Sequence, residues 1–150
     1  MKVIKIFFVL IIFAIVGGLV AGYVVDELIS KNIESALNDI TAPANTTVDS
    51  SISKTGKITN QDGGLQFYGA ILLQSNEKLG TLRSYYKSHA PQGIDLEVIN
   101  LADSKKIFGE NMPSELRFGY HDKSPENYYI VYAWGEAQLP YTMLDFRSYT

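Results

Sequence analysis

Two pairs of residues in the sequence have side chains whose types and spacing could do chemistry. His121 and Asp122 are adjacent, and a carboxylate beside an imidazole can orient it as a general base or form part of a metal site. Asp95 and Glu97 are two residues apart on a predicted strand. Because successive side chains of a strand point to opposite faces, both carboxylates lie on the same face. Calcium needs about six or more oxygen ligands, and no further acid lies close to this pair. A solvated strand face therefore explains it better than a metal site.

The remaining histidine, His89, falls at the end of a predicted helix, where a partly cationic imidazole interacts favourably with the helix dipole. The sequence has no nucleophile elbow, no zinc-protease motif, no phosphate-binding glycine loop and no cysteine. It therefore predicts a protein that is not an enzyme and that has no catalytic residues, no cofactor and no metal. A net charge of -3 without a basic face argues against nucleic acid as a partner.

Tyrosines are the more informative group. Tyrosine offers a large contact area at a low entropic cost, so an exposed cluster marks a protein or glycan contact surface. Any single one could instead be a half-buried strand tyrosine, which strand propensity alone predicts. For the group we predict a contact surface that comprises Tyr68, Tyr85, Tyr120, Tyr129 and Tyr132.

The elements that position these residues begin with an apolar segment, residues 6–25, which contains no charge. Twenty such residues are enough to cross a bilayer as a helix. Lys2 and Lys5 precede the segment and Asp26 and Glu27 follow it, which predicts a cytoplasmic N-terminus and an extracytoplasmic C-terminal domain in the cell (inner) membrane. A cleaved signal peptide is the competing interpretation, but its apolar region is normally about 7–15 residues long. We therefore expect an uncleaved membrane anchor over residues 1–25.

A stripe of small and apolar side chains runs through the anchor and continues beyond it. Its steps of four, four and three give an eleven-residue repeat, about 3.67 residues per turn, which keeps the stripe on one face of a helix. Small residues in its first half allow close helix packing in the membrane, and the second half is covered either by a partner or by the protein's own domain. The predicted helix-packing residues are Ala14, Gly18, Gly22, Val25, Ile29, Ile33, Ala36 and Ile40.

Outside the membrane we divide the chain into three parts. Residues 26–40 are predicted to extend the helix as an amphipathic segment that Pro43 terminates. Residues 41–64 are rich in Ser and Thr, which favours a linker, although Ser51 to Thr59 could add an edge strand. Residues 65–150 hold nine of the ten tyrosines and the single tryptophan, and are expected to form an extracytoplasmic α+β domain.

In this domain alternating and apolar runs predict strands over residues 65–73, 94–101, 115–120 and 128–134, the last apolar on both faces and therefore central. Ser75 is the expected N-cap of a helix that ends before Pro91. The predicted fold class is α+β: a long N-terminal transmembrane and amphipathic helix, then a small, mainly antiparallel sheet with one covering helix. The amphipathic segment is expected to cover the other face of the sheet.

A long N-terminal helix, apolar and then amphipathic, followed by a loop and an antiparallel sheet resembles the layout of type IV pilins and pseudopilins. That resemblance implies a filament subunit. Such proteins have a glycine just before the apolar run and an early glutamate within it, whereas here Lys5 precedes Ile6 and the first acid is Asp26.

Three functions follow from these patterns. The first is a single-pass, non-enzymatic cell-envelope protein that contacts other envelope proteins or a second copy of itself through its helix. The second is a pilin-like or pseudopilin-like filament subunit. The third and least favoured is a membrane-tethered hydrolase that uses His121, Asp122 and the Asp95/Glu97 pair.

Overall fold

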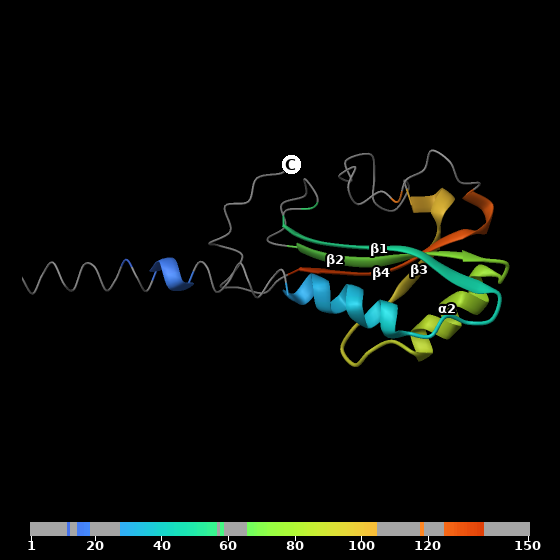
Figure 1. Ribbon diagram of the computed structural model, residues 1–150, viewed down its shortest axis with the longest axis horizontal. Helices are drawn as coiled ribbons and strands as arrows, with labels where there is room; N and C mark the ends of the chain where they lie inside the picture. Colours follow the sequence, from blue (N-terminus) through green and yellow to red (C-terminus); the bar gives the residue numbers. More distant parts are fainter. Residues whose placement is uncertain are drawn as a thin grey trace, which may run out of the picture.

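The computed structural model describes residues 12, 15–18, 28–56, 58, 66–104, 118 and 125–136. These residues form an α+β fold around a four-stranded antiparallel sheet (Figure 1). Residues 28–39 are helical. The later elements are β1 (Thr46–Gly56), β2 (Gln66–Ser75), α2 (Leu79–Ser88), β3 (Glu97–Asn100), η1 (Leu101–Asp103), η3 (Pro125–Asn127) and β4 (Tyr128–Glu136).

Most of the predicted membrane anchor lies outside the described residues. Ile12 and residues 15–18 are helical and exposed. Among the helices in the described part of the chain, none has both the length and the apolar character needed to cross a bilayer. The strand predicted over residues 115–120 also lies outside, apart from a buried Phe118.

Strand β4 lies in the interior of the sheet, as its apolar composition predicts. The strand order is β1-β2-β4-β3, and β4 pairs antiparallel with both β2 and β3. Strands β2 and β3 therefore run parallel to each other, joined by α2, but they are not neighbours, because β4 is inserted between them.

Both helices pack on the same face of the sheet (Figure 1). Ile33, Leu37 and Ile40 share one buried cluster with Leu82 and Tyr86 of α2. The prediction that the amphipathic segment covers the opposite face is therefore wrong. The physical reason lies in β1, which widens the sheet so that one face accommodates two helices.

A glycine allows the first helix to approach the sheet closely. A Cβ atom added to Gly69 of β2 would lie 2.6 Å from Cγ2 of Ile33 and 3.2 Å from the backbone nitrogen of Glu34. Ordinary contacts between carbon atoms are about 3.5–4.0 Å. Only a residue without a side chain fits between this helix and β2.

The opposite face carries a second buried cluster. Alternate residues of β2 and β4, among them Tyr68, Leu72 and Tyr132, point to this side and pack with Ile58 and Phe118. Because side chains alternate along a strand, these two central strands are buried on both faces. This explains their nearly continuous apolar sequences.

Strand β1 occupies part of the chain that the composition assigns to the linker. It pairs with β2 over its whole length, with a register shift between Val48 and Ser50. Its residues facing the helices are polar: Ser51 and Ser53 donate hydrogen bonds of 2.6 and 2.5 Å to the two carboxylate oxygens of Glu34. Polar contacts to a helix thus take the place of the apolar face expected of a strand. The alternation over Ser51 to Thr59 predicted an edge strand, and β1 is an edge strand that begins five residues earlier, at Thr46.

Helix α2 begins later than its predicted cap. Lys78 occupies the N-cap position, with no side-chain hydrogen bond. Ser75 instead ends β2, where its hydroxyl lies 2.6 Å from that of Thr46 and accepts a hydrogen bond from the backbone nitrogen of Glu77. The hydroxyl joins β1 to β2 and orders the turn into α2.

Candidate functional site

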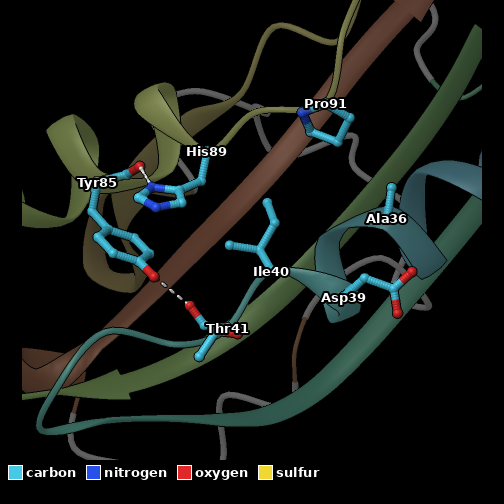
Figure 2. Close-up of a pocket in the computed structure, with 7 residues that line it drawn as sticks. All are labelled: Ala36, Asp39, Ile40, Thr41, Tyr85, His89 and Pro91. Carbon is cyan, nitrogen blue, oxygen red and sulfur yellow. Dashed lines mark hydrogen bonds between the residues drawn. The ribbon is translucent and has the colours of Figure 1, made fainter.

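An open hollow of about 530 Å³ lies where the two helices end (Figure 2). Ligand sites commonly have volumes of about 300–1,000 Å³. The helix at residues 28–39 and the segment after it contribute four of the lining residues, and the end of α2 contributes the others. The described residues that line it are Ala36, Asp39, Ile40, Thr41, Tyr85, His89 and Pro91.

Local sequence explains why both helices end here. Pro43 follows the first helix closely, and proline disfavours helical geometry in the residue before it. Beyond α2, Pro91 accepts the backbone N–H of Ile94 in a turn, and Gly93 has a φ of 82°. A left-handed φ suits glycine because it has no Cβ. The sequence thus stops both helices sharply, and their packing on one face brings the two ends together.

Tyr85 ties the two helix ends to each other. Its hydroxyl donates a 2.7 Å hydrogen bond to the backbone oxygen of Thr41. Its ring stacks on the imidazole of His89, with centroids 4.2 Å apart and planes inclined by 22°. One aromatic side chain therefore fixes the wall of the hollow and the connection between the helices (Figure 2).

His89 caps α2 and is held in one orientation. Its backbone N–H donates to the oxygen of Tyr85 over 3.1 Å, and its ring Nδ1 lies 2.8 Å from the same oxygen. A carbonyl oxygen only accepts, and the Ser88 hydroxyl, 3.0 Å from Nδ1, donates its own hydrogen to the same carbonyl, so Nδ1 carries the proton. In the neutral ring Nε2 is then an acceptor, and it lies on the side of the ring away from that carbonyl (Figure 2).

The polar groups around the hollow are mainly acceptors. Asp39 is exposed, and its carboxylate has no hydrogen-bond or ion-pair partner among the residues the structure describes. Among the residues that the structure describes, no lysine or arginine lines the hollow. Both helices also present their C-terminal ends, which carry partial negative charge. The arrangement therefore favours a ligand that donates hydrogen bonds and is positively charged.

The structure does not assemble the tyrosine surface predicted from the sequence. Tyr68, Tyr129 and Tyr132 are at most 8% exposed, and only Tyr85 is half-buried at the surface. Tyr120 lies outside the described residues. Burial raises the pKa of the Tyr68 and Tyr132 hydroxyls well above the usual range, and for Tyr132 a hydrogen bond to Glu97 adds to the effect. Three of the five side chains are thus part of the core, because the strands that carry them are covered on both faces.

The second half of the predicted helix stripe packs on the protein's own sheet. Ile33 and Ile40 are buried, and Ile29 packs against the same cluster, while Ala36 lines the hollow. Gly18 is helical and exposed, with nothing within 4 Å of an added Cβ. The other stripe residues, Ala14, Gly22 and Val25, lie outside the described residues.

Of the predicted carboxylate pair, Asp95 and Glu97, only Glu97 belongs to a strand. Asp95 precedes β3, whereas Glu97 is its first residue, directly opposite Tyr132. Glu97 accepts a 2.7 Å hydrogen bond from the Tyr132 hydroxyl. The carboxylate of Glu97 therefore serves as the hydrogen-bond acceptor of the buried Tyr132 hydroxyl. His121 and Asp122 lie outside the described residues, and within the described part no three His, Asp or Glu side chains are grouped so as to hold a metal ion.

Comparison of the chain with protein-family models, with curated proteins and with solved structures finds no match. The sequence showed His89 at a helix end, but the hollow also needs Asp39 and Tyr85, whose proximity follows only from the packing of two helices on one face.

Proposed function

We propose that this protein is a single-pass, membrane-anchored, non-enzymatic component of a cell-envelope assembly, with a cytoplasmic N-terminus and an exported α+β domain that contacts other proteins. One observation carries the proposal: the helix at residues 28–39 is part of the core of the domain. Ile33, Leu37 and Ile40 bury its apolar side against the sheet.

That helix follows the apolar segment almost directly. Three residue steps separate Val25 from Leu28, and such a stretch spans at most about 10 Å even when extended. A membrane that holds the apolar segment therefore holds the domain at its surface. This placement suits a protein whose domain makes contacts close to the lipid, and it supports an anchor with a structural role.

The division of the stripe supports a helix partner within the membrane. The large stripe residues beyond the apolar segment, Ile29, Ile33 and Ile40, pack on the protein's own sheet and are not available to a partner. Gly17 and Gly18 are exposed and have nothing within 4 Å of an added Cβ. Small residues of this kind let a second helix approach closely in lipid. We propose that a second copy or another envelope protein packs there.

Topology is the first test. The chain has no cysteine, so a single introduced cysteine is a unique label. Gln92→Cys lies in an exposed turn of the domain and should react with a membrane-impermeant maleimide in intact cells. Lys2→Cys is the matched control and should react only after permeabilisation. The reverse pattern, or recovery of the protein without membranes, would contradict the proposal.

Crosslinking tests the helix partner. Gly18→Cys should capture a second copy or another envelope protein in native membranes. Val16→Cys is the control, because two residues turn a helix by about 200° and place it on nearly the opposite face. Equal crosslinking at the two positions, or none at Gly18, would exclude a specific partner on this face.

A pilin-like filament subunit is the second candidate, favoured by the packing of the first helix on an antiparallel sheet. The mass of the mature protein separates the two proposals. Removal of residues 1–5 would favour the filament subunit, whereas an intact N-terminus would favour the envelope component.

A further inference from the structure

We propose that the hollow between the helix ends binds an aliphatic diamine or polyamine, with one amine at Asp39 and another at His89. This inference does not depend on the membrane function, because it uses only the geometry of the domain. The two polar ends of the site come from different helices, and Figure 2 shows them on opposite sides of Ile40.

The end at His89 accepts hydrogen bonds. Nδ1 is 2.8 Å from the oxygen of Tyr85 and therefore carries the proton, so Nε2 of the neutral ring is left with its lone pair. The Tyr85 hydroxyl donates its hydrogen to the backbone oxygen of Thr41, so its oxygen can still accept a hydrogen bond. An ammonium group, which has three donors and no acceptor, matches this pair of acceptors. The stacked rings add an aromatic wall, which favours cations.

The end at Asp39 provides the charge. Within the described part of the chain its carboxylate has no partner, and the end of its helix adds partial negative charge. A second ammonium group here would form a charge-assisted hydrogen bond. An anionic ligand would meet acceptors and negative charge at both ends, so the site selects against it.

The floor between the two ends is apolar. Ile40, Ala36 and Pro91 offer carbon surface along the hollow. A methylene chain fits this strip, and burying it is favourable. The ligand class follows from the order of groups along the hollow: hydrogen-bond acceptors at His89, then the apolar strip, then the carboxylate of Asp39. Cadaverine, with five methylenes between two amines, is the simplest probe of that pattern.

Nuclear magnetic resonance can test the site in the full-length protein held in a non-ionic detergent. The chain has only two histidines, so histidine labelling gives two imidazole signals, and His89→Phe assigns them. Cadaverine should shift the His89 signals in a saturable manner, with a Kd on the order of 1 mM for so small a ligand. Absence of a saturable shift at His89 would overturn the proposal.

Two comparisons test the pattern of recognition. Pentylamine, which lacks the second amine, should bind about fivefold more weakly than cadaverine. Asp39→Asn should weaken cadaverine binding by a similar factor, whereas Asp49→Asn, the same charge change on exposed β1, should leave it unchanged. Equal binding of the two amines, or an equal effect of the two substitutions, would show non-specific attraction and overturn the proposal.

Discussion

Replacing Gly69 by alanine tests the docking of the first helix on the sheet, on which both the proposed juxtamembrane placement and the hollow depend. The new methyl group would lie 2.6 Å from Cγ2 of Ile33, about 1 Å closer than ordinary contact. It would also lie 3.2 Å from the backbone nitrogen of Glu34. A side-chain rotation cannot relieve the second contact, so the helix itself must move.

The magnitude follows from the cost of overpacking a core. An added group that forces backbone shifts costs about 1–3 kcal/mol, a considerable part of the roughly 5–15 kcal/mol that stabilises a typical domain. We therefore expect Gly69→Ala to lower the free energy of unfolding by about 2 kcal/mol. Gly80 of α2 is the control, since nothing lies within 4 Å of an added Cβ there. Gly80→Ala should raise stability by about 0.5–1 kcal/mol, because alanine favours helix.

Urea unfolding of the full chain in detergent, followed by fluorescence, measures both changes. Trp134 is the single tryptophan, and its ring lies edge-on to Tyr68 with centroids 5.6 Å apart, so its emission reports the packing of the sheet. In an Ile33→Ala background the cost of Gly69→Ala should fall by about 1 kcal/mol, because the clashing methyl group is gone. A neutral effect of Gly69→Ala would refute the close packing of this helix on β2. An unchanged cost in the Ile33→Ala background would assign the cost to the backbone contact at Glu34 and refute the role of the Ile33 methyl group.

Three further outcomes follow from polar groups in the core. Glu34→Gln should destabilise the domain by about 0.5–1.5 kcal/mol, measured by the same unfolding assay, because the charge-assisted hydrogen bonds from Ser51 and Ser53 become neutral ones. Tyr86→Phe should be neutral or stabilising by up to about 1 kcal/mol, since the buried hydroxyl has no hydrogen-bond partner among the described residues; a loss above that size would reveal a partner. Burial raises the pKa of Tyr86 from 10.0 to about 12, so the unfolded chain loses this proton first and stability should fall as pH rises from about 10 to 12. Tyr86→Phe should reduce that alkaline slope, and an unchanged slope would contradict the assignment.

The central strands and α2 could be predicted from local patterns. Residues 66–75 and 128–136 carry apolar side chains on both faces, which marks interior strands, and Leu82 and Tyr86 recur at helical spacing. Strand β1 could not be predicted with the same force. Its inward side chains are serines and a threonine whose partners, Glu34 and Ser30, lie 17 to 25 residues away in the sequence.

The hollow depended on the tertiary structure in the same way. His89 follows α2 and Asp39 ends another helix, and nothing in the local sequence relates them. For the tyrosines, residue type predicted a surface that the structure does not form. Their residue type suits a contact surface, but three of the five belong to strands that are covered on both faces. Exposure is a property of what packs above a residue, which the residue's own type does not specify.

The sequence by itself indicated several of the elements: an apolar segment of membrane length, an amphipathic helix stopped by Pro43, and two apolar strands with a helix between them. These follow from side-chain periodicity and from the backbone restrictions of proline and glycine, which act over a few residues. Only the tertiary structure decided which face the first helix covers. Gly69 leaves room for it beside α2, and Glu34 finds its partners on β1. Those contacts join residues far apart in the chain, so their energies exist only once the sheet has formed.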